Sequence, residues 1–411
     1  MHYANGSSYD IVFAGAGLAG LAVATEMART PFFRQKNLLL IDRDAKQKND
    51  RTWCFWATPD EPLPPIVHCS WGKCRFLAPD FEAVLDISPY RYQMVRGADF
   101  YRWAQRELEQ WPNVQRITAD IRRIDPEKGR IETDAGSVAA ELILNSAFLP
   151  LPLLPQDPQL PWKNPLSVWP HLGNPMPASR QTFLLQHFKG WLVQTVEPAF
   201  DPGIMTLMDF RMEQHGETRF VYVLPLSPHR ALVEFTLFSR RLLPIAAYDE
   251  ALNHYLKAWL RLSTFTVEEE EFGIIPMTDY SFPLSYGSRV IHIGTAGGFV
   301  KASSGYAFKR TLRRARAFVR HWADEGHPST EPLRTKPIFC FLDRILLRVL
   351  RDQNDLGCRI FTDLFKKLPP TTVLRFLDED TNCRENLRIV NAPPKLPFLQ
   401  ALARTVLERY F

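Results

Sequence analysis

Residues 231–238 (ALVEFTLF) place one carboxyl group inside a run of apolar residues. The two-residue period of a strand puts Glu234 on the same face as Leu232 and opposite Phe235. A carboxyl group on an inner apolar face loses hydration when it ionises, so its pKa rises and it stays protonated near neutral pH. A general acid requires that state, which makes Glu234 the leading candidate for acid catalysis. The alternative is a solvated edge glutamate paired with an arginine.

A glycine-rich turn at residues 15–20 (GAGLAG) fits the GxGxxG pattern. It follows an apolar strand at 9–14 and opens a helix-like segment at 21–29, and a second strand at 37–41 ends in Asp42. Such glycines allow a tight turn, close approach of a pyrophosphate and close helix–strand packing, while the acidic residue accepts ribose hydroxyls. The pattern predicts a dinucleotide site that comprises Gly15, Ala16, Gly17, Leu18, Ala19, Gly20, Asp42, Arg43 and Arg51.

A second glycine cluster lies at residues 291–298 (IHIGTAGG), followed by SSGY at 303–306. FAD is longer than NAD, and folds that bury it often place a late strand–turn–helix against its pyrophosphate and ribityl chain. Two glycine turns so far apart therefore favour FAD in a discontinuous domain, with an ordinary loop as the alternative. The residues assigned to this turn are Gly294, Gly297, Gly298 and Gly305.

Composition bounds the class of protein. The chain has 411 residues, 45% of them apolar, and a formal net charge of +5. This mild excess does not indicate a nucleic-acid binder, but it is compatible with a basic face on an anionic membrane. Six cysteines without a CxxC pair predict reduced thiols and no metal site in a cytoplasmic protein. Neither a signal peptide nor an apolar stretch of about 18 residues is present, so no transmembrane helix is expected.

Six motifs, taken in order, resemble those of the flavin-dependent lycopene cyclases. DRTWCFW at 50–56 is similar to the family's HTWSFH-type segment, and LVEFT at 232–236 to its LIEDT or FLEET strand. The others are MDF at 208–210, FVYVLPL at 220–226, GIIPM at 273–277, and the late GG at 297–298 with SGY at 304–306, similar to the TGY turn. Their order and spacing agree over residues 9–320, and the chain is identified as a member of this family, of the bacterial or plant β-cyclase type.

The resemblance implies a flavoprotein hydroxylase-like α/β fold: a Rossmann-like FAD/NAD-binding domain, an inserted mixed β-sheet substrate domain and a C-terminal helical region. We expect the FAD domain to comprise residues 1–65, 96–150 and 270–325, the substrate domain 66–95 and 151–269, and the helical region 326–411. The proline-rich segment at 149–179 is a plausible crossing between domains.

The implied activity is that of an isomerase (an intramolecular lyase), which converts the linear ψ-ends of lycopene to the β-ionone rings of β-carotene without net redox change. The family implies reduced FAD, with NADPH or NADH as electron source, and a carotenoid substrate taken up at a membrane surface. Two alternatives are an FAD-dependent monooxygenase or isoprenoid reductase on the same scaffold, and a non-catalytic carotenoid or lipid carrier.

Two positions depart from the family pattern. Phe235 stands where many relatives have a second carboxylate, which assigns the acid to Glu234 and makes Asp209 the nearest other candidate, as an acid–base group or an orienting partner. Lys301 stands where relatives often have proline, and we expect it to be solvated rather than to act on the flavin.

A polyene substrate calls for an apolar tunnel whose mouth faces lipid. The aromatic candidates for its wall are Trp53, Phe55, Trp56, Phe210, Phe235 and Tyr306. Residues 308–322 and 341–351 form basic amphipathic patterns, which predict either lipid contact or solvated basic faces of domain helices.

Overall fold

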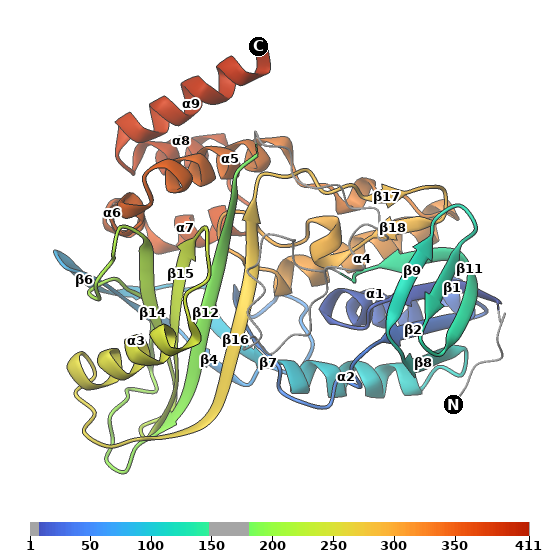
Figure 1. Cartoon of the computed structure of the whole chain (residues 1–411), viewed down its shortest axis with the longest axis horizontal. Helices are drawn as coiled ribbons and strands as arrows, with labels where there is room; N and C mark the ends of the chain where they lie inside the picture. Colours follow the sequence, from blue (N-terminus) through green and yellow to red (C-terminus); the bar gives the residue numbers. More distant parts are fainter. Residues whose placement is uncertain (1–7, 148–180, 411) are drawn as a thin grey trace.

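The computed structural model describes residues 8–147 and 181–410, which form three β-sheets and the helices around them (Figure 1). The first sheet has parallel strands in the order β11 (Gly136–Asn145), β1 (Ser8–Ala14), β2 (Leu38–Asp42) and β8 (Val114–Thr118). On the other side of β11 lie β18 (Val290–His292) and β17 (Ser285–Tyr286), and β11 also pairs with β10 (Arg130–Thr133), which pairs with β9 (Ile121–Asp125).

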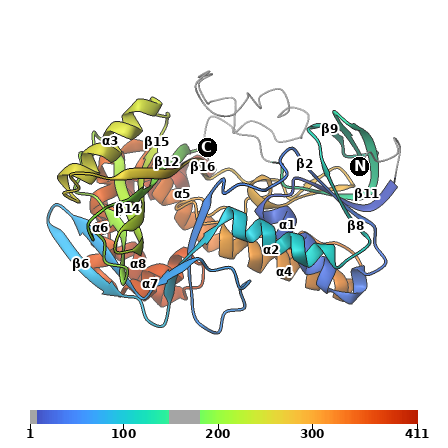
Figure 2. The same ribbon diagram turned by 90° about the horizontal axis from the view of Figure 1, so that it is seen from below.

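Three helices cover one face of this sheet: α1 (Leu18–Arg29), α2 (Gly97–Glu109) and α4 (Phe308–Glu325), which lie side by side in Figure 2. Ile11 and Phe13 of β1 pack on the helix side, while Val12 packs with the apolar side chains of β9 and β10. All three are at most 1% exposed. A parallel strand buried on both faces explains the continuous apolar run at 11–14.

The second sheet has seven strands in the order β16 (Thr266–Thr278), β12 (Phe183–Gln194), β15 (Arg230–Ser239), β14 (Thr218–Ser227), β13 (Ile204–Asp209), β5 (Lys73–Ala78) and β6 (Phe81–Asp86). Helix α3 (Ile245–Ala258) covers one face, where Val233 and Phe235 of β15 are buried against it. The third sheet is small and has three strands, in the order β3 (Thr52–Ala57), β7 (Arg91–Arg96) and β4 (Cys69–Trp71).

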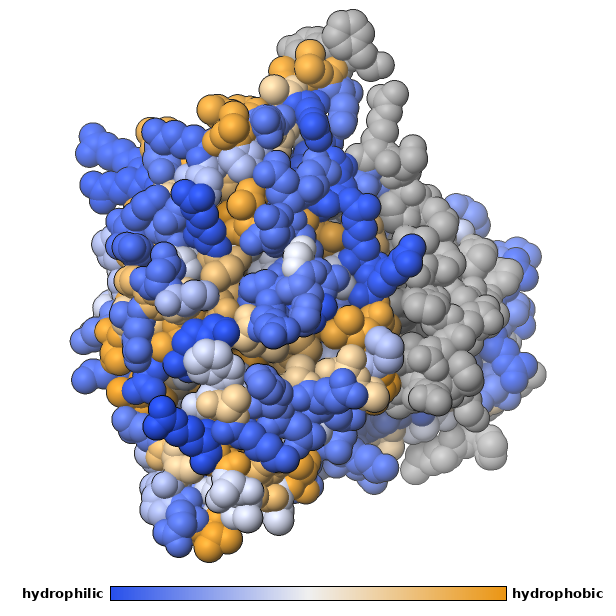
Figure 3. All heavy atoms as spheres, turned by 60° about the vertical axis from the view of Figure 1, so that its left-hand side comes forward, coloured by the Kyte–Doolittle hydropathy of each residue, from blue (hydrophilic) through white to orange (hydrophobic). Residues whose placement is uncertain are grey.

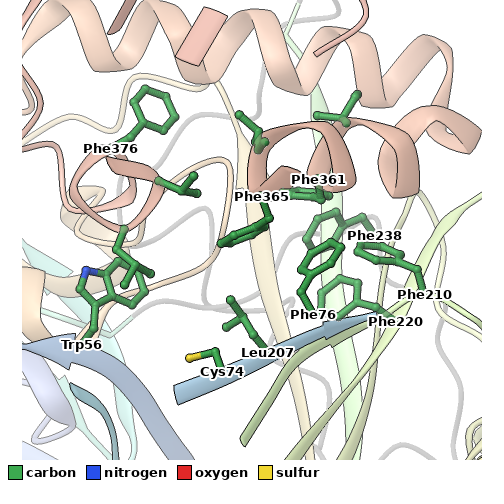
Figure 4. Packing of buried hydrophobic residues seen from close by; sticks show 14 of the residues in the cluster. Trp56, Cys74, Phe76, Leu207, Phe210, Phe220, Phe238, Phe361, Phe365 and Phe376 are labelled. Atoms are coloured by element: carbon green, nitrogen blue, oxygen red, sulfur yellow. The ribbon is translucent and has the colours of Figure 1, made fainter. Parts of the chain in front are cut away.

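The other face of the seven-stranded sheet packs on the C-terminal helices α5 (Pro337–Asp352) and α6 (Gly357–Lys367). Helix α7 (Pro370–Leu377) packs on α6, α8 (Cys383–Asn391) on α7, and α9 (Lys395–Tyr410) on α5. Figure 4 shows the contact, in which Phe361 and Phe365 of α6 meet phenylalanines of the sheet. Proline pairs separate these helices: α7 begins at Pro370, after Pro369, and α9 follows directly after Pro393-Pro394.

The strand that carries Glu234 is present as predicted. The run 231–238 lies in β15, which pairs antiparallel with β14, the strand that contains the motif at 220–226. The second glycine cluster follows a short strand, Val290–His292, and its glycines form a 3-10 turn at Gly294–Gly297. The expected domain boundary between 269 and 270 falls inside β16, and the proline-rich segment lies outside the described residues.

The two basic amphipathic helices turn their apolar sides inward. In α4, Leu312, Val319 and Trp322 are buried in the core of the first domain, while Arg313 and Arg316 on the opposite side pair with Glu61 and Glu26. In α5, Ile345, Leu347, Val349 and Leu350 are likewise buried, and Leu346 is partly buried against the same core. Domain-helix packing is therefore the correct alternative for both stripes. Within residues 8–147 and 181–410, every helix is too short or too polar to cross a membrane.

Candidate active site

A cavity of about 940 Å³ runs between the two large sheets. At one end it is lined by the β1–α1 turn, Asp42 and the turn after β18, and at the other by Tyr222, Glu234 and Glu271 of the seven-stranded sheet. The sequence-predicted dinucleotide site and the sequence-predicted acid therefore open into the same space.

The three glycines of the first turn differ in their surroundings as a dinucleotide site requires. Gly15 has φ +102°, and a Cβ there would lie 2.6 Å from Ser146 Oγ. A Cβ on Gly20 would lie 2.1 Å from the Gly15 carbonyl oxygen, so this glycine permits close packing of α1 on the turn. A Cβ on Gly17 would meet nothing within 4 Å, and Gly17 lines the cavity. Its backbone is thus open to a pyrophosphate.

The two glycine turns, far apart in the sequence, come together in space. Gly294 has φ +62°, and a Cβ on it would lie 2.8 Å from Cβ of Ala19 in the first turn. Asp42, at the end of β2, accepts a hydrogen bond from the Ala16 backbone N–H (2.7 Å) and lines the cavity. The residues present therefore fit a dinucleotide that extends past the first turn toward the second, as FAD does.

The other predicted cofactor residues divide between the cavity wall and its support. Leu18, Ala19, Arg43, Arg51 and Gly305 line the cavity. Ala16, Gly20, Gly297 and Gly298 lie outside the wall and support it. The backbone N–H of Ala16 donates a hydrogen bond to Asp42, and the carbonyl of Gly298 accepts one from Arg314 (3.0 Å). A Cβ on Gly297 would lie 2.4 Å from the His292 carbonyl oxygen.

Glu234 does not stand alone in the cavity. On β15 it is paired with Gly190 of β12, and on the other side of β12 Gly190 is paired with Glu271 of β16. A side chain at position 190 would fill the space between them, because a Cβ there would lie 3.0 Å from Glu271 Cγ. With only a hydrogen atom at that position, the two carboxyl groups face each other over the central strand, close enough for protonated Glu234 to donate a hydrogen bond to Glu271.

Protein surrounds both carboxyl groups except where they line the cavity. Because this burial removes part of their hydration, it changes the pKa of each group. Burial raises the pKa of Glu234 well above its ordinary value, and the neighbouring Glu271 carboxylate raises it further, against a hydrogen bond from Thr236 (2.9 Å). Burial also raises the pKa of Glu271, but hydrogen bonds from Thr52 (2.8 Å) and Glu234 favour its charged form.

The pair accordingly holds a proton on Glu234. Among the described residues, Glu271 Oε1 has no donor other than that carboxyl group. An acid of raised pKa, next to a carboxylate that can take the proton back, is suited to proton transfer to and from carbon.

Neutral hydroxyl groups and aromatic rings surround the acid. Tyr222, paired in register with Glu234, hydrogen-bonds to Tyr306, whose hydroxyl lies 3.3 Å from that of Tyr92. Burial raises the pKa of Tyr222 and of Tyr92 well above the ordinary value, so both stay un-ionised. The faces of these rings can stabilise a positive charge on a substrate.

The predicted tunnel residues separate into three groups. Trp53 and Tyr306 line the main cavity. Phe55 and Trp56 line an adjoining cavity of about 240 Å³, which shares Tyr306 with the first. Phe210 stacks on Phe361 (ring centroids 6.1 Å apart) in the core of Figure 4, and Phe235 is buried under α3. The last two lie in packed cores, away from the lining of either cavity.

Asp209 is not brought together with Glu234. Its side chain is fully buried outside the cavity wall, where it accepts hydrogen bonds from Arg211 (2.9 and 2.6 Å) and from Tyr255 (2.7 Å). This is the geometry of a structural ion pair.

The expectation for Lys301 is wrong. The side chain is 1% exposed, and Nζ donates to both oxygens of Asp343 (2.6 and 2.7 Å) with Glu379 at 3.4 Å. The lysine is therefore a buried ion-pair partner that ties the second glycine turn to helix α5, and it is neither solvated nor part of the cavity lining.

A family model described as "Lycopene cyclase protein" matches residues 10–403. The lycopene beta-cyclase of Paracoccus sp. is 24% identical, with 96% of each chain covered, and that of Pseudescherichia vulneris is 24% identical, with 95% of this chain and 96% of the relative covered. The chloroplastic/chromoplastic enzyme of Capsicum annuum is 30% identical over 44% of this chain and 41% of its own.

Solved structures share the fold at low identity. A geranylgeranyl bacteriochlorophyll reductase-like protein of Thermoplasma acidophilum superposes with a TM-score of 0.56 at 12% identity, covering 97% of this chain and 96% of the other. A flavin-dependent brominase gives 0.56 at 13% identity, covering 98% and 99%. The predicted fold class, a flavoprotein hydroxylase-like α/β architecture, is confirmed.

Proposed function

Because the chain belongs to the lycopene cyclase family, we propose that it is a lycopene β-cyclase that closes the ψ-ends of lycopene into β rings by proton transfer, with no net redox change. It would act on a carotenoid delivered from a membrane surface, with FAD in its reduced form and NADPH or NADH as the electron source. The observation that carries the proposal is the carboxyl pair Glu234–Glu271 in the cavity that also contains the dinucleotide turns.

The chemistry follows from the pair. Protonated Glu234 gives its proton to a carbon of the terminal double bond, and the π electrons of the neighbouring double bond then form the ring bond. The positive charge moves into the new ring, and a ring carbon releases a proton to the carboxylate pair. One proton is given and one returned, so the pair is restored and the product is an isomer of the substrate.

Electrostatics favours the cationic intermediate over the neutral substrate. After Glu234 has lost its proton, two carboxylates stand side by side in a site of low dielectric, and their repulsion is relieved by a cation next to them. Tyr222, Tyr306 and Tyr92 present un-ionised rings to the same space and do not compete as bases.

The cofactor would lie along the glycine turns. Gly17 and Gly294, with Asp42, would hold its pyrophosphate and ribose end, and the cavity leads from there to Glu234. When bound, reduced FAD supplies a negative charge that stabilises positive charge on the substrate. Arg51, which lines the cavity and pairs with Asp50 (2.9 Å), would contribute to binding the phosphates.

An anaerobic incubation with lycopene and dithionite-reduced FAD tests the proposal. We expect a ring-closed product of unchanged mass, without oxygen uptake. Stoichiometric consumption of NADPH with a saturated product would identify a reductase instead, an oxygen-dependent product would identify a monooxygenase, and carotenoid binding without turnover would identify a carrier. Each of these three results would overturn the proposal.

A further inference from the structure

Exposed apolar side chains are concentrated at one end of the molecule. Seven of the fourteen large apolar residues exposed in the described part of the chain lie between 387 and 407, on α8 and α9. They are Leu387, Val390, Leu396, Leu399, Leu402, Val406 and Leu407, and four of them are more than half exposed. Helix α9 projects from the body in Figure 1, and Figure 3 shows hydrophobic atoms at this end. Single apolar residues on a surface are ordinary, whereas a cluster of exposed ones marks an interaction site.

The exposed residues of α9 form one stripe. Leu396, Leu399, Val406 and Leu407 follow helical spacing, whereas Ala401 and Thr405 on the other side are 5% and 3% exposed. Helix α9 packs on α5 through that inner side. The helix is thus fixed to the body while its outer apolar face has no cover among the described residues.

The charges around this face are mostly positive. Between residues 383 and 408 the chain has four cations and two carboxylates. Both carboxylates are already paired with arginines of neighbouring helices, Glu385 with Arg375 and Glu408 with Arg348. Arg384, Arg388 and Lys395 are exposed and have no ion pair within residues 8–147 and 181–410. Apolar residues flanked by unpaired cations match an anionic lipid surface, because the leucines can insert among the acyl chains and the cations can pair with the lipid phosphates.

We propose that the outer face of α8 and α9 is a membrane-docking surface that inserts its leucines into the interfacial layer of an anionic bilayer. The inference rests on the proposed function, because a water-insoluble polyene must be collected from lipid. It adds the part of the chain that makes the contact, which differs from the two helices predicted from the sequence.

Vesicle flotation of the full-length protein tests the proposal. We expect it to float with vesicles of phosphatidylglycerol and phosphatidylcholine, and to float less with phosphatidylcholine alone. The double variant Leu399→Glu/Val406→Glu should lower the partition coefficient about tenfold or more. Arg384→Glu/Arg388→Glu should remove the preference for anionic lipid. The matched control is Val84→Glu/Val196→Glu, which changes two exposed valines elsewhere and should float like the wild type.

Every result has a defined meaning. Flotation of Leu399→Glu/Val406→Glu at the wild-type level, or no flotation of the wild type, overturns the proposal. A wild-type dimer that this variant converts to monomer, without vesicle binding, would show that a second copy covers the face. Cyclisation of detergent-dispersed lycopene is measured in parallel and should be unchanged in the variant. If the wild type floats but forms no ring, the proposed function fails while the docking surface stands.

Discussion

Glu271→Gln is the substitution that most clearly separates a shared proton from a lone acid. Glutamine keeps the size of the side chain over Gly190 but removes the negative charge that raises the pKa of Glu234. Its amide can also donate a hydrogen bond to Glu234, which favours the carboxylate. Both effects lower the pKa of Glu234, so the acid is ionised over a wider pH range and is inactive there.

The magnitude follows from the lost interaction. A hydrogen bond to a charged group contributes about 1.5–3 kcal/mol, which corresponds to a fall of about 1–2 pKa units at 1.36 kcal/mol per unit. The falling limb of the kcat–pH profile should move to lower pH by that amount, with activity about 10–100-fold lower at a pH where the wild type is fully active. Acidification should restore part of the activity.

The assay is anaerobic cyclisation of detergent-dispersed lycopene with reduced FAD across a series of pH values. Glu234→Gln should instead lose about 10²–10⁴-fold at every pH, because the proton donor itself is gone. Glu268→Gln on the same strand, whose side chain pairs with Arg230 at the surface, is the matched control and should be unaffected. An unshifted profile for Glu271→Gln, or an equal loss at all pH values, would refute a shared proton.

Three further outcomes are expected. The pKa of Glu234 is higher in the folded protein than in the unfolded chain, so the wild type loses stability as the pH rises from the unfolded pKa through the folded one. The Tm of apo Glu234→Gln should therefore exceed that of the wild type at pH 9 but differ little at pH 5. Equal Tm values at pH 9 would count against the raised pKa. Gly17→Ala should keep the apoprotein Tm but weaken FAD binding in a fluorescence titration, whereas Gly20→Ala should lower the Tm because its Cβ would meet Gly15; the reverse pattern would contradict the assignment. Asp209→Asn should cost about 2 kcal/mol or more of unfolding free energy in urea denaturation with kcat per folded molecule unchanged, and a selective loss of kcat would restore Asp209 as an acid–base candidate.

Local patterns were sufficient for the parts of the site that depend on local structure. The glycine spacing at 15–20 requires a tight turn wherever the strand ends, and the two-residue period of 231–238 determines that Glu234 and Phe235 point to opposite faces. The predicted tight turn and the predicted opposite orientation of the two side chains are both present, because neither depends on which strand pairs with the one that carries them.

Glu271 was missed because its role is decided by pairing over a long sequence distance. It ends a run of four glutamates, 268–271, and such a run is typical of a solvated surface. Only the register of β16 on β12, with Gly190 opposite, turns this one glutamate inward. A glycine inside the otherwise bulky strand 183–194 was the available signal, since it marks a close approach of other groups.

The aromatic residues show the same limit. Phe210 and Phe235 are as apolar as a tunnel wall would be, but hydrophobicity does not distinguish a cavity wall from a packed core. Tyr92 and Tyr222, which do line the cavity, lie in strands that look like ordinary core.

The central claim is that a proton held by Glu234 starts ring closure without redox chemistry. A single-turnover reaction measures this directly, using enzyme equilibrated in D2O with reduced FAD, no oxygen and analysis of the product by mass spectrometry. We expect one deuterium for the ring formed, bonded to carbon, and no such product from Glu234→Gln. A ring-closed product without deuterium, or labelled product at the wild-type rate from Glu234→Gln, would contradict it.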